Sequence, residues 1–169
     1  IILQTAAQLQ DRKDIHFVLI GDGKEKSALI AQAETLRLNN LTFIPPAPKV
    51  QMAEILSTAD AGVAILKPIE LYKTTYPNKV FDYMAAGCPV ILAIDGVIRQ
   101  VVEEAQAGIF VPPGQPEPMA EAIRSLASDP GRCRHMGQAG QTYIRQHFDR
   151  ARLAAEFANL LAEMRHSNG

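Results

Sequence analysis

Short apolar runs alternate with helical segments along most of this chain, and this alternation restricts its fold more than any other feature. Brief apolar runs of this kind are typical of strands buried on both faces of a parallel sheet. Apolar residues at helical spacing fill the stretches between them. The pattern therefore predicts an α/β protein with an open, mostly parallel sheet of five to six strands and helices on both faces. The expected strands are 16–20, 41–44, 61–66, 89–93 and 109–111.

Length and composition predict a single domain with an ordinary core. The chain has 169 residues, 47% of them hydrophobic and 21% charged, which is typical of a globular domain. Its start, Ile1-Ile2-Leu3 without Met, indicates a fragment of a longer protein that begins inside a helix. The net charge is −1 and the basic residues are spread along the chain, which argues against a nucleic-acid partner.

The cysteines and histidines do not predict a metal site. Cys88 and Cys133 lack the spacing of metal ligands, and the four histidines are scattered. Two unpaired thiols favour a reducing, cytoplasmic location. No apolar run approaches the roughly 20 residues of a membrane span, and the amino end lacks a signal-peptide pattern.

The stretch from Thr74 to Ile91 carries the clearest local signals. Pro77 suits the first helical position, because proline lacks the N–H group that a first turn leaves unbonded. Gly87 suits the end of the same helix, and 89–93 follows as a buried strand. The residues therefore predict a loop, a helix and a strand in close succession.

The start of this helix is suited to an anion. Backbone N–H groups of the first turn point outward, with the positive end of the helix dipole behind them. Asn78 and Lys79 lie in that turn, and Asp82 follows about one turn later, within reach of a hydroxyl-bearing group attached to a bound phosphate. The alternative is a solvated lysine and an acid that the dipole favours.

A second candidate loop, Gly21-Asp22-Gly23, follows the strand at 16–20. Neither glycine has a Cβ, so the backbone can approach a ligand closely. The alternative is a strand-to-helix turn that needs glycine in any case. A third glycine of the dinucleotide fingerprint is missing, which argues against a nicotinamide or flavin cofactor.

The run from Asp82 to Val90 resembles a motif of retaining glycosyltransferases built from two Rossmann-like domains, the GT-B architecture. The similarity is to the bacterial polysaccharide and lipopolysaccharide type, the glycosyl transferases group 1 family. Those enzymes commonly carry two Glu separated by seven residues, the second within Glu-Ala-Met-Ala-x-Gly-x-Pro-Val. The first Glu falls at Thr74, which is a departure. Pro77 and Lys79, with Asp82-Tyr83, fit a subgroup with the pattern Pro-x-Lys-x-x-(Glu/Asp)-Tyr.

The resemblance implies that the chain is the Rossmann-like, C-terminal half of a GT-B enzyme. It implies that Lys79 and Lys26 are catalytic and stabilise a departing diphosphate, with no metal and no cofactor besides the nucleoside-diphosphate sugar. Asp82 would hold the ribose hydroxyls. The residues expected to bind this donor are Gly21, Gly23, Thr75, Tyr76, Pro77, Asn78 and Asp82. Glu70 is a candidate to replace the missing first Glu.

The resemblance also implies partners. A sugar or lipid-linked acceptor would bind a missing N-terminal domain of the same chain, to which a helix at 149–169 would cross back. The enzyme would be cytoplasmic, peripheral at the inner membrane face through that domain, and would act in polysaccharide or lipopolysaccharide biosynthesis. The isolated domain would be inactive. Two alternatives stay open: a sugar-nucleotide epimerase-like isomerase, and a non-catalytic nucleotide-binding module.

Overall fold

A computed structural model describes residues 1–167, with the side chains at 150, 151, 153, 161, 162 and 165–167 excluded. The strands are β1 (Phe17–Ile20), β2 (Leu41–Ile44), β3 (Gly62–Ile65), β4 (Val90–Ala93) and β5 (Gly108–Phe110). The helices are α1 (Ile2–Ala7), α2 (Lys26–Thr35), α3 (Met52–Ser57), α4 (Asn78–Ala85), α5 (Val97–Glu104), α6 (Pro116–Ala127), α7 (Pro130–His147) and α8 (Arg150–Ser167), with 3₁₀ turns η1 (Lys49–Gln51) and η2 (Glu70–Thr74).

All strand pairs are parallel, as the alternating pattern predicts. β1 pairs with β2, and β4 lies between β3 and β5. The five strands thus form two ladders, of two and three strands, rather than one continuous sheet. Each predicted strand is present, and each of its ends lies within one residue of the expected position.

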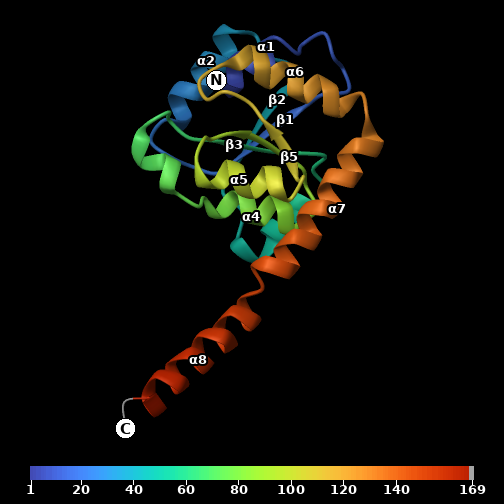
Figure 1. Ribbon diagram of the computed structural model, residues 1–169. Coiled ribbons are helices and arrows are strands. Elements are labelled where there is room, and N and C mark those ends of the chain that lie inside the picture. Colours follow the sequence, from blue (N-terminus) through green and yellow to red (C-terminus); the bar gives the residue numbers. More distant parts are fainter. Residues whose placement is uncertain (168–169) are drawn as a thin grey trace.

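Helices cover both faces of the three-stranded ladder (Figure 1). Successive side chains of β4 point to opposite faces, so Val90 and Leu92 pack with α4 and α5, whereas Ile91 packs with α6. Every residue of β4 is buried. A strand covered on both faces needs apolar side chains throughout, which explains the unbroken apolar run at this position.

The last two helices, α7 and α8, differ in how they pack against the rest of the domain. α7 packs closely against α4, because Gly137 lies where any Cβ would overlap the Gly87 carbonyl. α8, red in Figure 1, extends away from the rest of the chain. Its apolar side chains Phe157, Leu160 and Met164 are exposed. The expected helix at 149–169 is thus present over 150–167, and its last two residues lie outside the part described.

One local expectation needs correction. Pro77 is the N-cap of α4 rather than its first helical residue, since its ψ of 120° is extended. α2 begins at Lys26, after the Lys26 N–H closes a turn onto the Gly23 carbonyl at 3.0 Å. Leu29 of α2 is exposed and lines a hollow beside that turn.

Candidate functional site

The start of α4 is open toward solvent. The Pro77 carbonyl accepts a hydrogen bond from the Val80 N–H at 3.0 Å, which begins the helical ladder. No side chain caps this end, and its first turn contains no acidic residue. The N–H groups of Asn78 and Lys79 have no acceptor within the helix, because no helical carbonyl lies four residues before them. The helix start therefore has the free donors and the dipole that bind an anion.

Lys79 and Asp82 are both exposed on this first part of α4. Neither side chain forms an ion pair or a hydrogen bond with any residue in 1–167 whose side chain is described. A charged group without a protein partner is free to make a charge-assisted hydrogen bond to a ligand. Lys79 and Asp82 therefore lie at the same helix start, and neither side chain is held by a protein partner within the described residues.

Some of the hydrogen-bond donors in the loop before α4 bond within the loop itself. The Thr75 N–H donates to the Tyr72 carbonyl at 3.2 Å, and the Thr75 hydroxyl donates to the Leu71 carbonyl at 3.3 Å. Thr75 thus holds the end of η2. The N–H groups of Tyr76, Asn78 and Lys79 remain available as donors to a ligand. This internal bonding could not be predicted from the sequence, because it depends on the 3₁₀ turn.

An aromatic cluster packs a residue from the carboxyl-terminal part of the chain against the same helix start. The ring of Tyr76 lies 6.2 Å from that of Phe81, which in turn packs edge-on at 4.9 Å against Phe148. Phe148 directly follows α7. Tyr76 remains 53% exposed, so one side of its ring is still open to a ligand. Sequence reasoning missed this cluster, because Phe81 and Phe148 are 67 positions apart in the chain.

The Gly21–Gly23 loop and Lys26 form a second, self-contained turn. Gly21 has a φ of 140°, a conformation that favours glycine. The Gly23 N–H donates to the Asp22 carboxylate, and Lys26 Nζ donates to the Gly21 carbonyl, each at 2.8 Å. The ammonium of Lys26 therefore already has a protein partner, unlike that of Lys79.

Hollows of about 480, 470 and 290 Å³ lie at the carboxyl ends of the strands. The first two share Ile1 and Ile65, and the last two share residues of the loop after β3, so the three adjoin one another. In open parallel sheets this edge is where ligands bind. Gly21, Gly23 and Lys26 line the first hollow.

The residues at the start of α4 line none of these three hollows. They border the same edge of the sheet, because α4 and η2 follow the carboxyl end of β3 in the chain. The structure therefore gathers Gly21, Gly23 and Lys26 in one hollow, and places Thr75, Tyr76, Pro77, Asn78, Lys79 and Asp82 at one helix start outside it.

Charged side chains join the loops around the smaller hollow. Glu70 forms an ion pair with Lys73 at 2.8 Å, and this hydrogen bond raises the pKa of Lys73. Glu70, the candidate replacement for the missing acid, is thus already paired. The Lys73 backbone lies so close to Gly96 that any Cβ there would overlap it, and Gly96 has a φ of 100°. These contacts tie η2 to the start of α5.

Arg99 of α5 holds the next loop in place. Its guanidinium reaches Asp95 at 3.4 Å and Glu103 at 2.7 Å, and lies 3.8 Å from the ring centroid of Phe110. The hydrogen bond to Glu103 is the main reason that the pKa of Arg99 is raised. The spacing of four residues between Arg99 and Glu103 was visible in the sequence, whereas the stacking on Phe110 was not.

Both thiols serve packing. Cys88 is buried at the entry to β4, where its Sγ–H points to the carbonyls of Leu56 and Ala59 at 3.1 and 3.0 Å. Burial raises the pKa of Cys88 to about 11. Cys133 Sγ lies 3.0 Å from the Asp60 carbonyl. A thiol with a raised pKa is a poor nucleophile, so neither cysteine suits covalent catalysis.

Residues 1–167 contain neither a metal-ligand cluster nor a membrane-spanning helix. Over that range, His, Cys, Asp and Glu side chains form no group of three or more that could hold a metal ion. None of the helices described there combines the length and apolar character needed to cross a bilayer.

These observations define a class of protein: a Rossmann-like α/β domain whose helix start, at the carboxyl edge of its parallel strands, can hold a phosphate-bearing ligand. Comparison with known families makes the assignment specific. The family model described as "Glycosyl transferases group 1" matches residues 1–143. The chain belongs to this glycosyltransferase family.

Curated relatives cover a similar part of the chain. The D-inositol 3-phosphate glycosyltransferase of Rhodococcus jostii (strain RHA1) is 28% identical over 141 residues, which is 78% of this chain and 30% of that protein. The D-rhamnosyltransferase WbpZ of Pseudomonas aeruginosa is 26% identical over 136 residues, 80% of this chain and 35% of that protein. The chain thus spans about a third of the length of these relatives.

Solved structures share the fold. Sucrose-phosphate synthase from Thermosynechococcus elongatus superposes with a TM-score of 0.82 and 21% identity, over 98% of this chain and 42% of that one. Anabaena Alr3699/HepE in complex with UDP-glucose gives a TM-score of 0.80 and 20% identity, over 96% and 44% of the two chains. The predicted GT-B-type fold and family are confirmed.

Proposed function

We propose that this chain is the donor-binding half of a glycosyltransferase that transfers a sugar from a nucleoside diphosphate to an acceptor in surface polysaccharide or glycolipid synthesis. The observation that carries the proposal is the start of α4, which is uncapped, free of acids in its first turn and flanked by unpaired Lys79 and Asp82. The family assignment and the UDP-glucose complex of a protein with the same fold support a nucleotide-sugar ligand.

The donor diphosphate would bind the N–H groups at the start of α4 together with the ammonium of Lys79. Asp82, about one turn farther along, would accept hydrogen bonds from the ribose hydroxyls. Tyr76 would border the ligand with its exposed face, and Pro77 would set the direction in which the chain enters the helix. Thr75 would act through its bonds to η2, which hold this turn in place.

Catalysis would consist of positioning the donor and stabilising the charge that develops on the departing diphosphate. Lys79 and the helix start lie at the place where this charge would form. Lys26 would contribute from the Gly21–Gly23 loop, where its ammonium now bonds to the Gly21 carbonyl. A shift of Lys26 from that carbonyl to the diphosphate would accompany donor binding.

Other parts of the full enzyme complete this function. The acceptor would bind an N-terminal domain of the same chain, and α8 with its exposed Phe157 and Leu160 would pack on that domain. The enzyme would work in the cytoplasm, at the inner face of the membrane, and residues 1–169 alone would bind donor without turning it over.

Calorimetric titration with UDP, GDP and inorganic pyrophosphate tests the site. We expect Lys79→Ala to weaken all three ligands by about 10-fold or more, because a hydrogen bond to a charged group contributes about 1.5–3 kcal/mol. Asp82→Ala should weaken UDP and GDP similarly but leave pyrophosphate unchanged, since pyrophosphate has no ribose. Lys13→Ala and Glu121→Ala, exposed charges on other elements, are the controls. Equal binding by all variants would refute the assignment.

A further inference from the structure

The aromatic cluster beside the start of α4 contains four rings, those of Tyr76, Phe81, Tyr143 and Phe148. The Phe148 ring packs edge-on against that of Phe81 at 4.9 Å, and the Phe81 ring lies 6.2 Å from that of Tyr76. Tyr143 lies 6.1 Å from Phe148, and its hydroxyl donates to the Glu104 carboxylate at 3.0 Å. Tilted and edge-on ring pairs at such distances attract one another beyond the burial of their surface. The cluster therefore joins the loop before α4 to the end of α7 in one packed unit.

Phe81 is the member of the cluster that reaches the helix start. It is the fourth residue of α4, and helical side chains lean toward the amino end of their helix. Its ring accordingly meets that of Tyr76, which directly precedes the N-cap Pro77. Proline fixes its own φ, here −68°, so few backbone angles remain free between Tyr76 and the first helical residue. The direction of the N–H groups of Asn78 and Lys79 therefore depends on how the Tyr76 ring is held.

Phe148 holds Phe81 from the side of α7. It is the C-cap of that helix, and its N–H still bonds to the Ile144 carbonyl at 2.8 Å. Its φ of −128° and ψ of 25° then end the helical path. The Phe148 side chain also packs against the core cluster that α4, β4 and α5 share. The ring is thus fixed both by the helix before it and by the core beneath it.

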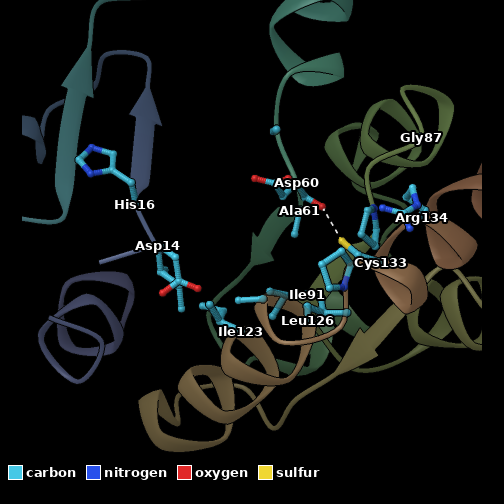
Figure 2. A pocket seen from close by; sticks show the side chains of 15 residues that line it. Asp14, His16, Asp60, Ala61, Gly87, Ile91, Ile123, Leu126, Cys133 and Arg134 are labelled. Atoms are coloured by element: carbon cyan, nitrogen blue, oxygen red, sulfur yellow. Dashed lines mark hydrogen bonds between the residues drawn. The ribbon is translucent and has the colours of Figure 1, made fainter. Parts of the chain in front are cut away.

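α7, which carries Phe148 at its end, is itself fixed to the three-stranded ladder and to α4. Near its amino end, Cys133 Sγ points to the Asp60 carbonyl, shortly before β3, at 3.0 Å (Figure 2). Farther along, Gln141 Nε2 donates to the Ala85 carbonyl at the end of α4 at 3.2 Å. A side chain on a well-packed element can hold a functional group precisely, and Phe148 meets this requirement.

We propose that Phe148 is a positioning residue of the donor site. Its ring fixes Phe81, and Phe81 fixes Tyr76. The peptide after Tyr76 then presents the N–H groups of the helix start in the direction that fits a diphosphate. Phe148 acts through these rings and does not contact the ligand. The inference rests on the proposed function, because it adds a residue that prepares the same helix start for the donor.

The same residue ties the donor site to the α7–α8 junction. Phe148 and Asp149 are the only residues between the two helices. The Asp149 carboxylate caps α8 by accepting a hydrogen bond from the Arg152 N–H at 2.8 Å. The backbone angles of these two residues therefore set the direction in which α8 extends (Figure 1). Energetic coupling between two sites is reciprocal, so a donor that orders Tyr76 and Phe81 also restricts Phe148.

Calorimetric titration with UDP tests whether the ring of Phe148 matters for donor binding. Phe148→Leu keeps an apolar side chain but removes the edge-on ring contact, and we expect it to weaken UDP binding by about 3- to 10-fold. Phe148→Tyr keeps the ring and should bind UDP within about twofold of the unaltered chain.

Ile144→Ala is the matched control for these variants. The Ile144 side chain packs against the same core cluster from α7 but contributes no ring. We expect this control to lower Tm at least as much as Phe148→Leu and to leave UDP affinity unchanged. Unchanged UDP affinity in Phe148→Leu would overturn the proposal. An equal loss of affinity in Phe148→Leu and Ile144→Ala would also overturn it, because the effect would then come from loosened packing in general.

Backbone amide shifts recorded by NMR during a UDP titration distinguish this inference from the proposed function. We expect UDP to shift the amides at the start of α4 and, through the rings, those of Phe148 and Asp149. In Phe81→Leu at saturating UDP, the shifts at Phe148 and Asp149 should disappear, whereas those at the start of α4 should persist. Shifts at the start of α4 without any at Phe148 would overturn this inference and leave the proposed function in place. No shift at the start of α4 would refute the proposed function, and this inference with it.

Discussion

The two ladders of the sheet differ sharply in how well they are enclosed. Every residue of β4 is buried between α4 and α5 on one face and α6 on the other. In β1 only Phe17 is buried, and Val18 is 49% exposed. The β3–β4–β5 ladder is therefore a finished core, whereas the β1–β2 ladder has one edge and part of its faces open.

This difference separates the two parts of the candidate site. The start of α4 belongs to the finished ladder, since Val80 and Met84 of the same helix are fully buried in its core. The Gly21–Lys26 loop belongs to the open ladder and lines the hollow at its carboxyl end. We infer that the start of α4 is anchored by this enclosed core, whereas the Gly21–Lys26 loop is carried by the less enclosed ladder.

The largest expected effect is on the free energy of unfolding, when one side chain from each ladder is shortened to alanine. Leu92→Ala removes a fully buried side chain from β4 and should lower the free energy of unfolding by about 2–5 kcal/mol. Val18→Ala in β1 should cost less than about 1 kcal/mol, because half of that side chain is already exposed. Urea denaturation of both variants measures the difference. Similar costs would mean that the two ladders are equally enclosed.

A smaller effect concerns Cys88, at the entry to the finished ladder. Its pKa is raised from 9.0 to about 11 in the folded protein. Below pH 9 the thiol is neutral in both states, so its contribution is constant. Between pH 9 and 11 the unfolded chain releases this proton first, so stability falls as pH rises, by up to about 2–3 kcal/mol.

Denaturation at pH 8, 9 and 10 measures this slope, with Cys88→Ala as the comparison. The variant should lose stability less steeply than the original chain above pH 9. Identical slopes for the variant and the original chain would show that the thiol is not buried in solution.

Local patterns were sufficient to predict the α4 region. Gly87, with a φ of 77°, ends the helix, and the N–H of Cys88 bonds back to the Tyr83 carbonyl at 2.9 Å, a pairing set by adjacent residues. The helix and the strand after it were predicted on the same basis. Lys79 and Asp82 could be placed on the first turns because their positions depend only on where that helix begins.

Long-range packing explains what the sequence did not predict. The separation of the five strands into two ladders depends on tertiary arrangement, which no local sequence pattern reports. The contact of Phe81 with Phe148 and the bond from Lys26 to the Gly21 carbonyl depend on tertiary packing or on a side-chain conformation. Their residue types alone are equally compatible with solvent exposure.

The central claim is that a nucleoside diphosphate binds at the start of α4. Backbone amide shifts of isotope-labelled residues 1–169, recorded by NMR during a titration with UDP, test it most directly. We expect the largest changes at Asn78 and Lys79, with smaller ones at Gly21 and Gly23. Unchanged amides at Asn78 and Lys79, with UDP-dependent shifts confined to other elements such as α7, would contradict the account.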